Sequence, residues 1–156
     1  MEYALYKKRI ILLFILCFCV LGVLSAQTGA EIEALLKTSS VTYAQAAGFV
    51  LRASEAAVIS SQKAAFDYAV ERNWLPKNVS PDSQARLDGI SLLFMRSFNL
   101  RGGLFYSLFK NPHYAYRELA ARGAFKGKSD PLMAVSGEQL LFITSRFLSI
   151  AERGNK

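Results

Sequence analysis

Histidine, cysteine and carboxylate side chains are the groups in this chain that could do chemistry. His113 is the single histidine of the 156 residues, and both cysteines, Cys17 and Cys19, lie in one apolar run near the N-terminus. Metal sites and nucleophilic centres need several such groups at characteristic spacing, and the sequence has no cluster of that kind. We therefore expect no catalytic residue of this type, no metal and no cofactor.

Acidic residues are the other candidates, because a carboxylate pair can cleave glycosidic bonds. Asp82 stands where an acid stabilises the start of a predicted helix, and Glu138 belongs to the first turn of another. Asp67 and Asp88 complete the set. Structural roles account for the first two, so we predict that the protein is not an enzyme.

Aromatic and basic residues are better suited to binding. Trp74, the sole tryptophan, could stack on a sugar ring or close a small core. Tyr114 belongs to an aromatic-rich segment whose exposed part would suit a protein or glycan partner. Arg86 and Arg117 either contact a ligand or lie solvated along a helix, and His113 either contacts a sugar or fills a first helical turn. These five are the predicted glycan- or partner-binding residues.

The N-terminus has the pattern of an export signal. Basic residues at 7–9 precede an apolar run of fifteen residues, 10–24, whereas a membrane-spanning helix needs about 20. Small residues follow, so we expect a signal peptide over 1–26, cleaved after Ser25 or Ala26. The alternative is an uncleaved anchor, which would be the only membrane contact.

Export and charge limit the possible partners. Both cysteines fall within the predicted signal, so the mature chain would carry no disulfide. Removal of 1–26 would take three of the 19 basic and one of the 12 acidic residues, which lowers the formal net charge from +7 to +5. That surplus could favour an anionic envelope polymer, or it could simply be a solvated basic face. An exported protein does not normally meet nucleic acid, so we expect a location in the periplasm or cell envelope and no nucleic-acid partner.

Helical periodicity and capping signals run along most of the remaining chain. Thr42 with Gln45, and Ser136 with Gln139, have the spacing of a capping box. The helix that starts at Thr42 keeps its apolar spacing through Val58. These patterns predict an all-α fold.

Other start and stop signals predict the remaining helix boundaries. Ser61 is expected to start a helix that stops by Leu75, because Pro76 disfavours helical geometry in the residue before it. The other signals are a serine cap followed by proline, an asparagine cap followed by proline, and a glycine stop: Ser80 and Pro81, Asn111 and Pro112, and Gly123.

The capped segments recur at fixed offsets. At an offset of 94, Thr42, Gln45 and Arg52 align with Ser136, Gln139 and Arg146. At an offset of 50, Arg72, Leu75 and Arg96 align with Arg122, Phe125 and Arg146. We predict a single domain over 27–156 with a half unit at 38–60 and further units at 61–100 and 101–151.

This order of helix, glycine-containing loop and capped helix resembles the S-layer homology repeat. The stretch "HYAYRELAARGAFKGKSDP" and the helix after it carry the likeness over His113–Leu148, with a looser match over Phe66–Phe98 and half a unit over Val41–Ala53. The resemblance implies helix-loop-helix units packed as a small pseudo-threefold helical domain. It also implies noncovalent anchoring to cell-wall glycan or peptidoglycan.

The main ligand contact of that family is the arginine of a Thr-Arg-Ala-Glu motif. This chain has Tyr43 and Gly137 at the position in the first and third units, and Leu87, or Arg86 in a shifted register, in the second. The capping positions of the motif are kept, while the guanidinium is absent from two units. We predict a noncatalytic exported envelope protein that associates with wall glycan; the alternative is a periplasmic module that binds another envelope protein.

Overall fold

The computed structural model describes residues 29–127 and 129–154, and its internal contacts divide the chain into two compact units, 1–37 and 38–156. The described part of the first unit is a helix over 29–36. The predicted signal peptide at 1–26 lies outside the described residues. Within the described ranges, no helix is both long enough and apolar enough to cross a membrane.

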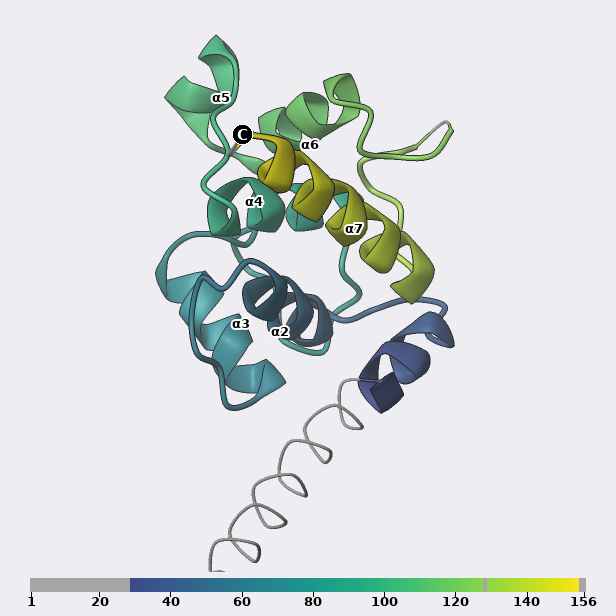
Figure 1. The fold of residues 1–156 in the computed structure, drawn as a ribbon. Coiled ribbons are helices and arrows are strands. Elements are labelled where there is room, and N and C mark those ends of the chain that lie inside the picture. Colours follow the sequence, from purple (N-terminus) through teal and green to yellow (C-terminus); the bar gives the residue numbers. More distant parts are fainter. Residues whose placement is uncertain (1–28, 128, 155–156) are drawn as a thin grey trace, which may run out of the picture. The chain divides into compact units, whose positions relative to one another are not determined.

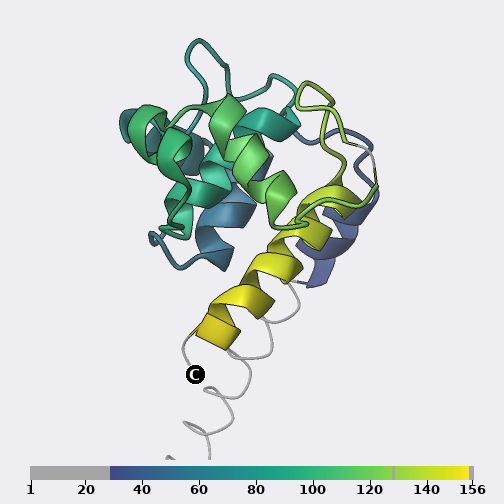
Figure 2. The same ribbon diagram turned by 90° about the horizontal axis from the view of Figure 1, so that it is seen from above.

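The second unit consists of helices joined by loops. They are α2 (Tyr43–Ala53), α3 (Gln62–Glu71), α4 (Leu87–Ser97), α5 (Leu104–Phe109), α6 (Pro112–Ala121) and α7 (Gly137–Gly154). α2 packs against α3, and α4 packs against α6 (Figure 1). In the view of Figure 2, the C-terminal half of α7 projects beyond the other helices of this unit. Every regular element in the described residues is a helix, which confirms the all-α prediction.

An aromatic cluster joins α4 and α7 in the core. The Phe94 ring centroid lies 5.2 Å from that of Phe147 and 5.8 Å from that of Phe98. Phe94 and Phe147 are almost fully buried. Such offset ring pairs add to the free energy gained from burial, so they fix α7 against the middle of the unit.

The predicted capping boxes are confirmed. The Thr42 hydroxyl accepts from the Gln45 N–H at 3.2 Å, and Gln45 Oε1 accepts from the Thr42 N–H at 2.9 Å. Ser136 and Gln139 repeat both bonds, at 3.2 and 3.0 Å. Each box satisfies backbone donors that the first turn of a helix leaves unpaired.

Other local signals are also confirmed. The Asn111 side chain accepts from the Tyr114 N–H at 3.0 Å, and Pro112 begins α6. Gly123 follows that helix with φ 66°, the left-handed conformation that favours glycine. Ser61 caps α3 through the Ala64 N–H.

The predicted helix start at Ser80 is wrong, because α4 begins at Leu87. The segment before it is a loop whose carbonyls serve another helix. Pro81 O accepts from the Ala44 N–H at 3.0 Å, and Ser83 O accepts from the Tyr43 N–H at 3.1 Å. Bonds to a distant helix thus override a good local start signal.

Two further expectations need correction. The helix that starts after Thr42 ends at Ala53, where Glu55 takes a positive φ of 53°, and Val58 is fully exposed rather than part of the core. α5, over Leu104–Phe109, was not predicted as a helix. Its six residues are too short to show a helical period in the sequence.

Candidate functional site

Three loop residues form a closed ring of backbone hydrogen bonds. The Val41 N–H donates to Val135 O at 2.8 Å, the Val135 N–H donates to Ala85 O at 2.9 Å, and the Ala85 N–H donates to Val41 O at 2.8 Å. All three residues are fully buried. The ring satisfies every amide and carbonyl group that these residues bring into the core.

The ring fixes the starts of three helices. Two residues after each ring residue stand Tyr43, Leu87 and Gly137, the first residues of α2, α4 and α7. Each of their amides donates to a neighbouring loop carbonyl, at 3.1 Å to Ser83, 3.0 Å to Met133 and 2.9 Å to Thr38. Each helix start therefore forms a junction with a neighbouring loop, with the side chain of Tyr43 or Leu87 at two of the junctions and a glycine at the third.

Tyr43 fills the first of these junctions. Its side chain is 2% exposed, and its Oη accepts a long 3.4 Å hydrogen bond from the Arg86 N–H. A Cβ at Gly89 would lie 2.5 Å from this oxygen, so the glycine makes room for the ring. Burial raises the pKa of the Tyr43 hydroxyl, which stays neutral.

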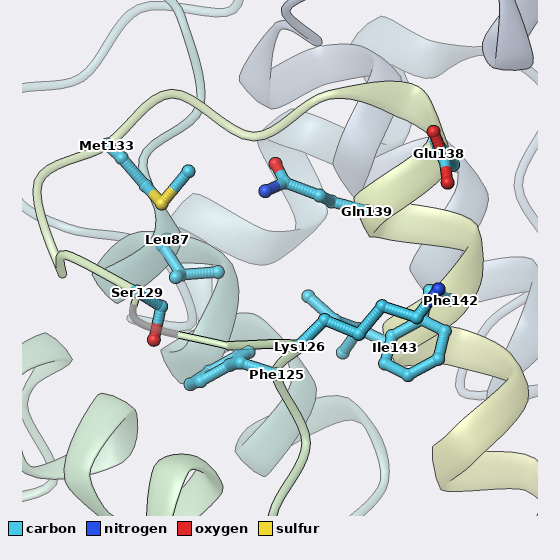
Figure 3. A pocket seen from close by; sticks show the side chains of 9 residues that line it. All are labelled: Leu87, Phe125, Lys126, Ser129, Met133, Glu138, Gln139, Phe142 and Ile143. Carbon is cyan, nitrogen blue, oxygen red and sulfur yellow. The ribbon is translucent and has the colours of Figure 1, made fainter.

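The junction at Leu87 is open and holds a small pocket (Figure 3). Gln139 and Ile143 reach toward it from α7, and Met133 borders it from the loop. Its volume of about 70 Å³ is the space of roughly two water molecules. The lining residues are Leu87, Phe125, Lys126, Ser129, Met133, Glu138, Gln139, Phe142 and Ile143.

The polar lining residues of this pocket are Lys126, Ser129, Glu138 and Gln139. Lys126 Nζ lies 5.0 Å from the centre of the Phe142 ring, a cation–π contact, and Figure 3 shows its chain running along that ring. The Gln139 carbonyl oxygen is used by the Ser136 N–H. Lys126 and Gln139 were not among the predicted binding residues. The sequence identified Gln139 only as part of a capping box and gave no sign that it also lines a pocket.

Arg86 stands at the N-cap of α4, one position before Leu87. Its guanidinium forms a two-point pair with Asp88, with Nη2 to Oδ2 at 2.8 Å and Nε to Oδ1 at 3.2 Å. Asp88 Oδ1 also accepts from the Gly89 N–H at 2.7 Å. The hydrogen bonds to Asp88 and its negative charge raise the pKa of Arg86, and the pair occupies the fork that a ligand carboxylate would use.

The remaining predicted binding residues lie elsewhere. Trp74, half-buried after α3, makes an edge contact with Tyr68 at 5.7 Å between ring centroids. His113 and Tyr114 lie in the first turn of α6 and contact each other edge to face, and Arg117 is exposed one turn further on. The structure brings His113 and Tyr114 together, but it does not gather all five predicted residues into one site.

A solvent-exposed apolar surface lies on α5 next to Tyr114. We call Leu104, Phe105, Leu108 and Phe109 the α5 apolar face; they are 79%, 58%, 70% and 55% exposed. The Tyr114 ring stacks on Phe105 and Phe109 at 5.6 and 5.4 Å. Sequence reasoning placed the aromatics here but could not decide which were exposed.

In the part of the chain that the structure describes, no three His, Cys, Asp or Glu side chains are grouped closely enough to hold a metal ion. Comparison with protein-family models, with curated proteins and with solved structures finds no match for this chain.

Proposed function

We propose that this protein is a noncatalytic, exported component of the cell envelope that associates with cell-wall glycan or peptidoglycan through a scaffold like that of the S-layer homology domain. The ring of Val41, Ala85 and Val135 carries the proposal, because three loops bonded in a cycle are what three units around a pseudo-threefold axis require. The ring residues stand at the offsets of 94 and 50 that the sequence repeats.

Matching helix ends support the same three-unit reading. Two residues after the last residue of α3 and of α6 stand Asn73 and Gly123, which both have positive φ and are 50 positions apart. After α2 and α4, the corresponding residues Glu55 and Asn99 also have positive φ. Chain segments that begin on one hydrogen-bond ring and end in the same backbone motif are those expected of related units.

The details of the junctions suggest how wall binding differs from the family pattern. If the ring residues mark equivalent positions of three units, Tyr43, Leu87 and Gly137 stand at the expected arginine position, and none of the three is an arginine. With Arg86 paired to Asp88, the exposed Lys126 is the cation best placed beside the open junction. We therefore expect weak, salt-sensitive association.

Retention on purified peptidoglycan sacculi tests this proposal. The protein should sediment with sacculi at low salt, and Lys126→Ala should reduce the bound fraction severalfold. The control is Lys63→Ala, which removes an exposed lysine of α3 that is far from Lys126 in the sequence and is paired with Asp67. It should change the bound fraction little. No sedimentation of the wild-type protein at low salt contradicts wall association.

The α5 apolar face favours a second candidate function, a module that binds another envelope protein. Four large apolar side chains exposed on one short helix are a typical protein contact. A stoichiometric partner captured from envelope extract should survive muramidase digestion and be lost with Phe105→Ser. Capture that disappears with muramidase favours the wall instead.

A further inference from the structure

A second, larger pocket lies at the C-terminal end of α4, away from the helix start that contacts the ring. It lies between Trp74, which follows α3, the last turn of α4 and α5, and its volume is about 510 Å³. Pockets for small molecules have volumes of about 300–1,000 Å³, and the volume of this pocket falls within that range. It is independent of the proposed wall-binding site.

Three cations line this pocket: Arg96, Arg101 and Lys110. Among its lining residues, all of which are described, none is acidic, and none of the three cations forms an ion pair with a described residue. The negative charge of Glu118 is close enough to Tyr106 to contribute to raising its pKa. Glu118 Oε1, however, accepts a hydrogen bond from the Gly103 N–H. Like charges gathered around one cavity create a positive potential that favours an anion.

Two polar atoms at the pocket lack a partner. Arg96 Nε and Tyr106 Oη are buried and form no hydrogen bond within the described protein, and Tyr106 is only 4% exposed. Buried polar groups are nearly always hydrogen-bonded in folded proteins, so such a pair of atoms needs an explanation. The Tyr106 ring is held in place against Gly102, where an added Cβ would lie 2.4 Å from the ring.

We propose that this pocket binds an oxyanion, a carboxylate or phosphate group, carried by a small molecule whose ring lies against Trp74. Arg96 supplies a guanidinium fork, Tyr106 supplies a hydroxyl donor, and Arg101 and Lys110 supply charge at the mouth. Arginine forks bind planar oxyanions through two parallel hydrogen bonds. The indole of Trp74 provides the apolar surface on which a sugar ring stacks.

Trp74 lines this pocket and is the sole tryptophan of the chain, so no other tryptophan contributes to the fluorescence signal. The wild-type protein should show a saturable change when titrated with glucose 6-phosphate or glucuronate at up to about 10 mM, a range that detects millimolar binding. The response to these two probes distinguishes phosphate from carboxylate. Glucose at the same concentrations should give no change. Equal responses to all three sugars, or no response to either anion, overturns the proposal.

Exposed residues at the mouth allow a test without risk to folding. The double variant Arg101→Gln/Lys110→Gln should weaken binding at least about tenfold. A matched pair of exposed lysines outside the pocket, in Lys63→Gln/Lys77→Gln, should change it less than about twofold. Equal weakening in both double variants indicates general charge attraction and contradicts a built site. Sacculus retention should be the same for both variants, so failure here is distinguishable from failure of the wall proposal.

Discussion

The two junctions at Tyr43 and Leu87 share one backbone arrangement but differ in what fills them. In the first, Tyr43 lies against Gly89 and leaves no space. In the second, Leu87 lies beside Gln139, the third residue of α7, just as Gly89 is the third residue of α4. A pocket remains at this junction. The backbone bonds therefore set where a junction forms, whereas the pair of side chains decides whether it is open.

This difference also explains the unusual start of α4. A tyrosine in the first junction requires glycine at 89, so α4 cannot have the glutamine that completes the capping boxes of α2 and α7. Asp88 takes over, with its Oδ1 accepting from the Gly89 N–H while Arg86 neutralises its charge. The presence of Tyr43 in the first junction is therefore linked to a different N-terminal cap on α4.

Exchanging the glycine should break the closed junction most severely. Gly89→Gln puts a Cβ 2.5 Å from Tyr43 Oη and 2.9 Å from Pro76 Cγ, so we expect the free energy of unfolding to fall by about 3 kcal/mol. Denaturant unfolding followed by circular dichroism measures it. Gly29→Gln, where an added Cβ meets nothing within 4 Å, is the control. An unchanged midpoint for Gly89→Gln means that Tyr43 can leave the junction freely.

Adding Tyr43→Leu to Gly89→Gln gives the closed junction the leucine and glutamine of the open one. This should restore part of the stability that Gly89→Gln removes. Tyr43→Leu alone should cost about 2 kcal/mol, because it removes buried volume and the acceptor of the Arg86 N–H. In combination with Gly89→Gln the costs should not add, with a coupling energy of about 2 kcal/mol in a double-mutant cycle. Strict additivity is the result that contradicts direct packing of the two side chains.

Alkaline pH should act on the closed junction and not on the open one. Burial raises the pKa of Tyr43 above its ordinary value, so the unfolded chain releases this proton first as the pH rises. The contribution of the neutral Tyr43 hydroxyl to the free energy of unfolding is complete below about pH 10. It is lost as the pH passes through the folded-state pKa, by up to about 1.4 kcal/mol per pH unit. Burial of Tyr106 acts in the same direction.

The variant Tyr43→Phe should flatten this loss of stability above pH ~10, measured by urea unfolding at several pH values. Tyr116→Phe provides the comparison, because the Tyr116 hydroxyl bonds to the Ser129 loop outside the closed junction. If both variants retain the wild-type slope, Tyr43 is not the group responsible.

Removing the caps should have the smallest effect. Thr42→Ala at α2 and Ser136→Ala at α7 should each lower the free energy of unfolding by about 1 kcal/mol, because each removes one acceptor for a first-turn amide. Ser39→Ala, an exposed serine in the loop before α2, should leave it unchanged. Very unequal costs of the two caps would indicate that the side chains in the junctions, rather than the caps, secure the helix starts.

Sequence reasoning succeeded where a signal acts within one turn of helix. The capping boxes at Thr42 and Ser136 are hydrogen bonds between residues three apart, and the proline after Asn111 acts within the first turn of α6. Both signals are therefore visible in the sequence. It failed at Ser80, whose local signal was sound, because Pro81 and Ser83 give their carbonyls to α2. Such long-range bonds leave no mark in a single sequence.

The candidate sites show the same division. Trp74 was singled out by its rarity, yet the pocket beside it also depends on Arg96, Arg101 and Tyr106, which no spacing connects with it. The α5 apolar face was seen as aromatic-rich, but its exposure depends on what α6 covers. Residues drawn from three separate elements can be assigned to one site only when the packing is known.

By itself, the sequence determined that the described chain is helical and where several helices are capped, because propensity and capping are local energies. The tertiary structure alone decided that Val41, Ala85 and Val135 bond in a ring, and that one junction is filled while another is open. Those outcomes depend on hydrogen bonds and side-chain volumes that meet across 44 to 94 residues of chain, at a distance where no local preference acts.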